Sequence, residues 1–357
     1  MKTQSPYLQD IEPDAEEEEA GLYDAVTAEQ DLWFLPGPDP DTEEDPFAPP
    51  LPRAPRRTLI DLAEWRAAEA AQGLALNDLA LDLGRLLERV ETMGPGAAER
   101  LAHAEAASMS WWTGDRIGAE RIALRLAWRI GATGEDAEAL IRTAWAARRL
   151  AAAGPVTRDG LSRLAAHLGL DPGTGHGLLG DVAALLPGPG DLGAVATGCA
   201  AFHLWRGLEE RPAHLRDIEA AVLGARLGLG GENRALGFLP LTLAGIGALT
   251  AGGPAERKLA AWIAGAHHAV LSALMTLDRL RRWRVQACAA TVDLTGRTPD
   301  LLIDALARQP MVTVPQIVSE TGASRPAVRR NLALMEKRGL VREVTGQGRF
   351  TVWAARL

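Results

Sequence analysis

The stretch from Met311 to Trp353 constrains the fold more than any other part of the sequence, because it combines helix caps, turn residues and placed charges. Thr313 is predicted to cap a short helix, with Gln316 completing a capping box. The run Thr321-Gly322-Ala323 is predicted to end that helix. Ser324 is predicted to cap a second helix. Two short helices joined by a tight turn are typical of a helix-turn-helix.

The second helix carries its apolar and basic residues on opposite faces. Val328, Leu332 and Met335 recur at helical spacing and are predicted to pack against the first helix. The opposite face is expected to meet a DNA major groove, as a recognition helix does. We assign the DNA contact to a set of capping, turn and basic residues: Ser324, Arg325, Pro326, Arg329, Arg330, Lys337 and Arg349.

Two β-rich runs follow the second helix, which is predicted to end at Gly339. They span residues 340–344 and 349–353, and the residues between them, Thr345-Gly346-Gln347-Gly348, contain the glycines of a turn. This pattern predicts a β-hairpin, which would form the wing of a winged helix-turn-helix. We place this domain at residues 298–357.

Residues 58–297 are predicted to form an all-helical domain, since apolar stripes at helical spacing alternate with short breaks such as Gly94-Pro95-Gly96. The longest helical pattern runs from Pro254 to Ala290 and is expected to brace the C-terminal domain or to form a dimer seam. His267 on this pattern is interpreted as a core or interface residue rather than a ligand. The fold class is therefore mostly α. The shorter stripes are Leu76, Leu79, Leu83, Leu86, Leu87 and Val90; Ile122, Leu126 and Ile130; and Leu140, Ile141, Ala144 and Trp145.

Residues 1–57 form an acidic, proline-rich tail with 15 acidic and 4 basic residues. Such a segment buries too little apolar surface to fold alone, so it is predicted to be disordered. Its apolar island between Leu22 and Leu35 is expected to dock on the body of the protein; the alternatives are a protein partner or mimicry of nucleic acid. The chain carries a net charge of -8, but without the tail it is mildly basic. Nine basic and five acidic residues in 298–357 favour phosphate contact.

Other classes of site are not indicated. Cys199 and Cys288 lie far apart, which predicts neither a disulfide framework nor a metal site and favours the cytoplasm. The run Gly228 to Asn233 fails the dinucleotide-binding pattern, and no zinc-protease or serine-hydrolase motif occurs. Because these motifs are absent, no cofactor is expected. No apolar run reaches the length of a membrane helix, so no membrane contact is expected either. Trp111-Trp112 is interpreted as packing in the core and at its boundary; the alternative is a role in base stacking.

Two blocks, Glu105 to Asp115 and Leu340 to Trp353, carry a family resemblance. With the helix-turn-helix they resemble uncharacterised alphaproteobacterial proteins that join a helical domain of unknown function to a helix-turn-helix. That family is in turn distantly similar to degenerate Fic proteins, which share a helical core and often end in a winged helix. Fic nucleotidyl transferases use a His-Pro-Phe motif with a glycine-rich anion loop. None of the seven histidines here precedes a proline, and residues 203–216 lack the loop, so the resemblance implies no catalytic residue and no enzyme.

We therefore expect sequence-specific binding of double-stranded DNA through the C-terminal domain, in a transcriptional regulator. A homodimer is expected, because one winged helix contacts few phosphates and bases. The alternative is an adaptor protein, whose winged helix binds protein and whose acidic tail is the active part. A residual Fic-type nucleotidyl transferase is the third hypothesis.

Overall fold

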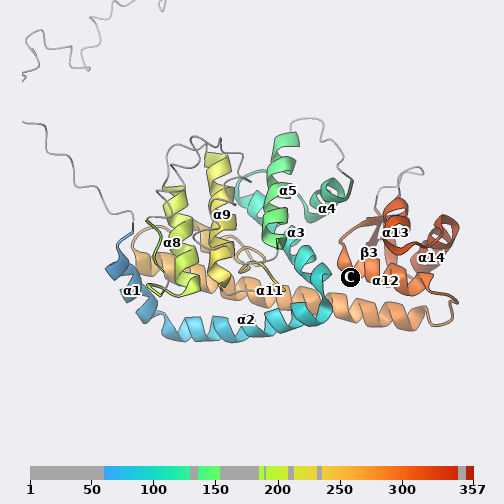
Figure 1. Ribbon diagram of the computed structural model, residues 1–357, viewed down its shortest axis with the longest axis horizontal. Helices are drawn as coiled ribbons and strands as arrows, with labels where there is room; N and C mark the ends of the chain where they lie inside the picture. Colours follow the sequence, from blue (N-terminus) through green and yellow to red (C-terminus); the bar gives the residue numbers. More distant parts are fainter. Residues whose placement is uncertain are drawn as a thin grey trace, which may run out of the picture. The chain divides into compact units, whose positions relative to one another are not determined.

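The computed structural model describes most of the chain beyond the acidic tail. The described residues are 60–128, 136–152, 185–188, 190–207, 213–230, 235–344 and 351–357. Contacts divide the chain into residues 1–57 and 58–357, and every described residue lies in the second unit. The predictions for the tail fall outside the described residues. Within those residues the protein is mostly helical, as predicted, with three short strands (Figure 1).

The described helices follow the apolar stripes of the sequence. On α2, Leu79, Leu83, Leu86 and Val90 are buried as predicted. Ile141 on α5 departs from the prediction and is 49% exposed, because adjacent helix positions lie about 100° apart and Leu140 takes the buried face. Ile130 lies outside the described residues. The helices are α1 (Leu62–Ala71), α2 (Gly73–Met93), α3 (Pro95–Trp112), α4 (Ala119–Trp128), α5 (Ala137–Ala151), α8 (Ala194–Arg206), α9 (Ala213–Leu229), α10 (Gly247–Thr250), α11 (Ala255–Ala290), α12 (Thr298–Arg308), α13 (Val314–Thr321) and α14 (Arg325–Lys337).

Helix α11 belongs to two hydrophobic cores. Its first six turns or so, as far as Leu277, pack into the core of the helical region. Leu280, Trp283 and Ala287 instead pack into a second core with α12, α13 and α14. With 36 residues and a rise of about 1.5 Å per residue, the helix is about 54 Å long. The predicted long helix is confirmed, and it braces the C-terminal region.

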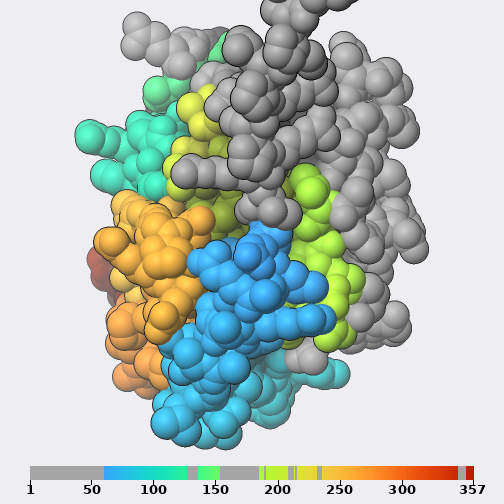
Figure 2. Space-filling view, turned by 90° about the vertical axis from the view of Figure 1, so that its left-hand side faces the viewer, coloured from blue at the N-terminus to red at the C-terminus, as the bar shows by residue number. Residues whose placement is uncertain are grey.

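Helices α1 and α2 pack against α11, and Figure 2 shows the blue surface of the first helices beside the orange surface of α11. Glu64 accepts a hydrogen bond from the Ala255 N–H at 2.7 Å, and Asp82 lies 2.9 Å from His267 Nε2. His267 is therefore a satisfied interface residue, as predicted. By length and composition α11 could cross a membrane, as no other helix in the described residues could. Because its apolar face lies in the two cores, we interpret it as a core helix.

A buried carboxylate joins α3 to the loop before α10. Glu105 is fully buried, and its Oε1 accepts hydrogen bonds from the N–H groups of Leu241 and Thr242, each at 2.8 Å. Burial raises the pKa of Glu105 to about 7, although these hydrogen bonds oppose the rise. The other carboxylate oxygen has no hydrogen-bond partner among the described residues.

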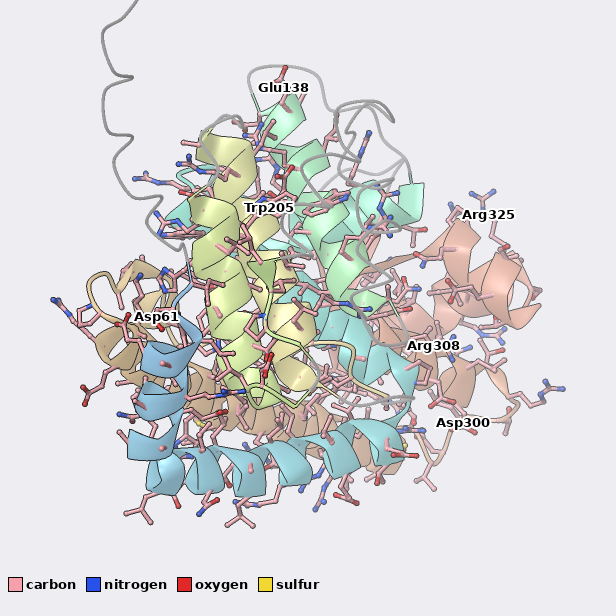
Figure 3. The ribbon with its side chains drawn as sticks, turned by 60° about the vertical axis from the view of Figure 1, so that its left-hand side comes forward. Asp61, Glu138, Trp205, Asp300, Arg308 and Arg325 are labelled. Carbon is pink, nitrogen blue, oxygen red and sulfur yellow. The ribbon has the colours of Figure 1, made fainter. Side chains whose placement is uncertain are left out.

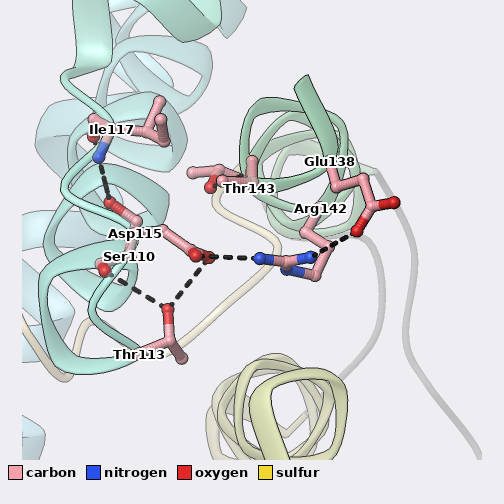
Figure 4. A network of polar contacts seen from close by, with 8 residues as sticks. Ser110, Thr113, Asp115, Ile117, Glu138, Arg142 and Thr143 are labelled. Carbon is pink, nitrogen blue, oxygen red and sulfur yellow. Dashed lines mark hydrogen bonds and ion pairs between the residues drawn. The ribbon is translucent and has the colours of Figure 1, made fainter. Parts of the chain in front are cut away.

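The block Glu105 to Asp115, which carried part of the resemblance, ends α3 in a polar network (Figure 4). The Ser110 hydroxyl accepts a hydrogen bond from the Ile117 N–H at 2.8 Å, and Arg142 donates to Asp115 at 2.8 Å. Trp112 packs against Phe202 with ring centroids 5.9 Å apart, as predicted. Trp111 lies at the boundary of the core rather than inside it. Its side chain is 60% exposed, because the next helix position points away from the core.

A three-stranded antiparallel sheet lies beside α12, α13 and α14. The strands are β1 (Val312–Thr313), β2 (Val341–Glu343) and β3 (Val352–Ala355), in the order β1-β3-β2. The predicted antiparallel pairing of the two runs is confirmed, with Arg342 opposite Ala354, but the second strand begins three residues and ends two residues later than predicted. Strand β1 was not predicted, since two residues are too few to show alternation. The predicted turn, with Arg349 and Phe350, lies outside the described residues.

Candidate nucleic-acid interface

Both predicted caps begin the helices of the helix-turn-helix. Thr313 accepts a hydrogen bond from the Gln316 N–H at 3.3 Å, and Ser324 accepts one from the Ala327 N–H at 3.4 Å. Between the helices, Gly322 has φ 68°, a left-handed conformation that glycine adopts without strain. The predicted capping box does not form. The Gln316 side chain donates to Glu320 at 2.9 Å, while Thr313 lies in β1, paired with Val352.

The inner face of α14 is packed as predicted. Val328, Leu332 and Met335 are buried in the second core together with Ile317 of α13. Asn331, which was not predicted to have a role, is also buried, and its Nδ2 donates to the Ala327 carbonyl at 2.9 Å. The apolar stripe therefore fixes which side of α14 faces outward.

The end of α14 is a Schellman motif. The Leu340 N–H donates to the Met335 carbonyl at 2.9 Å and the Gly339 N–H donates to the Glu336 carbonyl at 2.9 Å. Gly339 has φ 71°, as this motif requires. The predicted helix end at Gly339 is confirmed.

The outer face of α14 carries every predicted contact residue that the structure describes. These side chains are all exposed: Ser324, Arg325, Pro326, Arg329, Arg330 and Lys337. The structure thus brings them together on one helix of 13 residues, about 20 Å long. In Figure 3, Arg325 projects outward at the end of the winged-helix region. Arg349, the seventh, lies outside the described residues.

The basic residues of this region fall into two groups. Arg325, Arg329, Arg330 and Lys337 make no side-chain hydrogen bond or ion pair with any described residue. Arg338 and Arg342 are already paired. They lie 2.6 Å from Asp293 and 2.8 Å from Glu120, respectively. Counting charges along the sequence could not separate the groups, because both partners lie outside the winged helix. Four of the unpaired cations of this region therefore lie on α14; Arg356, which follows β3, likewise has no such partner in the described residues.

Two residues that sequence reasoning missed fasten this region to the helical body. Arg100 of α3 donates to the carbonyls of Leu306 and Gln309, both at 2.6 Å, and burial lowers its pKa to about 10. Trp283 of α11 donates to the Leu340 carbonyl at 2.8 Å. An arginine or a tryptophan within a helical pattern carries no local signal of such a distant partner. They tie the end of α12 to α3 and the residue after α14 to α11.

The packing of α3 against α12 is too close for a side chain at Gly96. A Cβ at this position would lie 2.5 Å from the Arg308 Cα, which no real contact allows. Arg308 is labelled in Figure 3, at the end of α12. In the part of the chain that the structure describes, no three His, Cys, Asp or Glu side chains are grouped to hold a metal ion.

Comparison with protein families identifies the C-terminal region. Residues 295–349 match the model of the MarR family, a stretch that begins three residues before the predicted boundary and contains α12, α13 and α14. Among curated proteins, none matches the chain. The C-terminal region is therefore a winged helix-turn-helix of the MarR type, which indicates a DNA-binding transcription regulator. The alphaproteobacterial and Fic-like resemblances of the helical region stay predictions.

Proposed function

We propose that this protein is a transcriptional regulator that binds specific sequences of double-stranded DNA by placing α14 in the major groove. One observation carries the proposal. Four cations that lack any partner in the described residues share the exposed face of the second helix of a helix-turn-helix, while neighbouring Arg338 and Arg342 are paired elsewhere. An arginine that is already paired must break its ion pair before it contacts phosphate or a base edge, which costs free energy. An unpaired arginine can make the contact directly.

The position of each cation suggests its role. Arg325 lies in the first turn of α14, beside the Ser324 cap, where the helix dipole and free N–H groups attract phosphate. Arg330 lies midway along the exposed face, so we assign it to a guanine, which arginine contacts in bidentate fashion. Lys337 ends the helix and is assigned to phosphate, as are Arg329 and the wing residue Arg349.

Selection of bound sequences from random double-stranded DNA tests this function. The full chain should enrich a defined motif, and its affinity for that motif should fall as salt rises. The variant Arg325→Ala/Arg329→Ala/Arg330→Ala should lose the enrichment. A matched control, Arg279→Ala/Arg281→Ala/Arg282→Ala, removes three exposed arginines of α11 and should keep it. If the wild type enriches no motif at moderate salt, the adaptor role predicted as the alternative takes precedence.

The protein is proposed to act as a homodimer in the cytoplasm. Exposed apolar side chains lie on α2 and α11, two helices that pack side by side: Leu74, Leu81, Leu271 and Met275. Of these, Leu74 is 83% and Leu81 is 69% exposed. Two winged helices in a dimer would contact two half-sites, which supplies the affinity that one domain lacks.

Light scattering coupled to size exclusion tests the dimer. The molar mass measured for the wild type should be that of two chains. The variant Leu81→Glu/Met275→Glu should have the molar mass of one chain, and its circular-dichroism spectrum should match that of the wild type. A wild-type mass of one chain would contradict the proposal.

We propose no catalysis in the helical region. In the segment that would correspond to the Fic motif, His203 packs edge-on against Phe202 at 4.9 Å, and burial lowers its pKa to about 3. Transfer of label from α-labelled ATP to the protein or to added protein substrates would contradict this.

A further inference from the structure

One face of α11 stays exposed along the half of the helix that leads into the second core. Its residues recur at alternating spacings of four and three, which places them on a single stripe of an α-helix. We call this set the α11 stripe. Each of its side chains is exposed and belongs to neither of the two cores that α11 enters: Leu271, Met275, Asp278, Arg282, Val285 and Ala289. The stripe lies outside the residues that match the MarR family.

The apolar members of the α11 stripe are largely exposed. Val285 is 65% exposed and Met275 is 57% exposed. Single exposed apolar side chains are ordinary, but several on one face of a helix mark an interaction surface. Alternating spacings of four and three are those by which a second helix packs along the first. The α11 stripe is therefore a candidate surface for another helix.

The α11 stripe is self-complementary about its midpoint, which lies at the level of Leu280. Its members form three pairs, whose residues lie two, five and nine positions on either side of this midpoint: Asp278 with Arg282, Met275 with Val285, and Leu271 with Ala289. Two antiparallel copies of α11, related by a two-fold axis at this level, would place the members of each pair opposite each other. Each apolar side chain would then meet an apolar one, and each charge would meet its opposite.

The two charged residues favour the antiparallel arrangement over the parallel one. In the parallel arrangement Asp278 would face its own copy, and so would Arg282, and like charges at an interface are unfavourable. Arg282 makes no ion pair with any described residue; its Nε donates to the Asp278 carbonyl at 3.4 Å. Asp278 pairs with Arg89 of α2, yet its side chain remains 51% exposed, so it can accept a further donor.

The packing of the winged helix leaves the α11 stripe free. Leu280, Trp283 and Ala287 face the second core. Each of them lies two residues from a member of the stripe, and therefore about 160° away around the helix. A partner on the stripe would thus require no change in the contacts between α11 and the C-terminal region.

We propose that two copies of this chain associate through their α11 stripes, antiparallel, about a two-fold axis at the level of Leu280. This inference rests on the homodimer of the proposed function and deepens it, because it names the surface and the register of that dimer. Two of the exposed apolar side chains that motivated the homodimer, Leu271 and Met275, belong to the stripe.

Charge reversal in the full chain tests the register, with the dimer dissociation constant measured by sedimentation equilibrium. Arg282→Asp places two carboxylates at each charged pair, and Asp278→Arg places two guanidinium groups there. Each variant alone should dissociate at least about tenfold more readily than the wild type. An equimolar mixture of the two should regain the wild-type affinity, because every carboxylate again faces a guanidinium group. A variant that had merely lost its fold would not be rescued by mixing.

Arg281→Asp is the matched control for charge reversal. This arginine is exposed on α11 but lies about 100° around the helix from Arg282, so the dissociation constant should not change. Removal of a charge without reversal, as in Arg282→Ala, should also have little effect, since exposed ion pairs contribute little.

Disulfide trapping tests the same register by geometry. In a chain that carries Cys288→Ala, the pair Met275→Cys/Val285→Cys should give a covalent dimer when its thiols are oxidised, as seen on a non-reducing gel. Within one chain these positions are ten residues, about 15 Å, apart along the helix and cannot bond to each other. Met275→Cys alone should give no covalent dimer, because its two copies would also lie about 15 Å apart along the seam. The remaining native thiol, Cys199, is buried.

The outcomes separate this inference from the proposals on which it rests. A wild type that stays a single chain would refute the homodimer and the register together. A dimer that Arg282→Asp leaves unchanged, or that Met275→Cys traps as well as the pair does, would overturn the α11 stripe and retain the homodimer. A stable dimer that selects no DNA would refute the proposed DNA binding and retain the register.

Discussion

Individual side chains of α14 make separable predictions, because exposure and pairing are known for each. Arg330 lies exposed between the two ends of the helix, whereas Lys337 lies in its last turn. We expect Arg330→Ala to cost about 1 to 3 kcal/mol on the selected motif and to relax the preference at one base pair. Lys337→Ala should weaken binding to all sequences alike and reduce the salt slope by about one.

These losses are measured by fluorescence anisotropy on the selected motif and on scrambled DNA at several salt concentrations. Arg338→Ala provides the comparison, since that arginine already pairs with Asp293. Equal losses on both DNAs for Arg330→Ala and Lys337→Ala would refute the distinction between base and phosphate contacts.

The buried Glu105 predicts a pH dependence of folding stability. Its pKa rises from 4.5 when exposed to about 7 in the fold. The protonated form is therefore favoured in the folded state, and the stability it contributes is present below pH 4.5 and is lost as the pH rises to about 7. The pKa difference corresponds to about 3 kcal/mol as an order of magnitude. His103 acts in the opposite direction, since burial lowers its pKa from 6.5 to about 4.

Because Glu105 and His103 change the folding stability in opposite directions as the pH rises, the pH dependence of the wild type alone does not show the contribution of either residue. We expect the free energy of urea unfolding of Glu105→Gln, relative to that of the wild type, to increase between pH 5 and about pH 7. Glu256→Gln, which replaces an exposed carboxylate of α11, serves as the control and should show a constant difference. A constant difference for Glu105→Gln as well would mean that Glu105 stays ionised throughout this range.

At the scale of the element, the end of α11 contacts the C-terminal region through exposed pairs such as Arg284 with Asp304 and, within the apolar core, through the buried hydrogen bond of Trp283. Trp283→Phe keeps an aromatic ring among Leu280, Ala287 and Leu332 but removes the donor to the Leu340 carbonyl. We expect a loss of about 1 to 2 kcal/mol in urea unfolding. Trp111→Phe, at a position 60% exposed, should cost less than about 0.5 kcal/mol. Similar losses at both positions would contradict the structural role of this bond.

Some features of the helices are determined by residues that are close in the sequence, and these could be predicted. Ser324, the buried stripe of α14 and Gly339 act within a few residues of their own positions, so the start, the buried face and the end of α14 were predicted correctly. Arg100 and Arg342 find their partners 206 and 222 residues away, and no local pattern encodes such pairs.

At the scale of the whole molecule, the second core extends beyond the predicted domain boundary at residue 298. Leu280, Trp283 and Ala287 of α11 contribute to it. A fragment of residues 298–357 should therefore show little protection of its amide protons in hydrogen exchange. A fragment of residues 277–357 should be protected in α12 and α14, because it completes the core. Equal protection in the two fragments would show that the winged helix folds without α11.

One unbroken helix, α11, enters both cores. The number of residues between Leu277 and Leu280 therefore sets the direction in which the exposed face of α14 points relative to the helical region. Each residue added to an α-helix turns everything after it by about 100° and moves it by about 1.5 Å. A single inserted residue would rotate Arg330 by a quarter turn or more about the axis of α11. If the C-terminal region instead kept its place, the hydrogen bonds of Arg100 to the end of α12 would break. Seven added residues return the helix to within about 20° of its original phase. Whether this part of α11 tolerates an insertion therefore depends on the rotation that the insertion causes. The spacing of the two half-sites on the DNA would change with the same rotation.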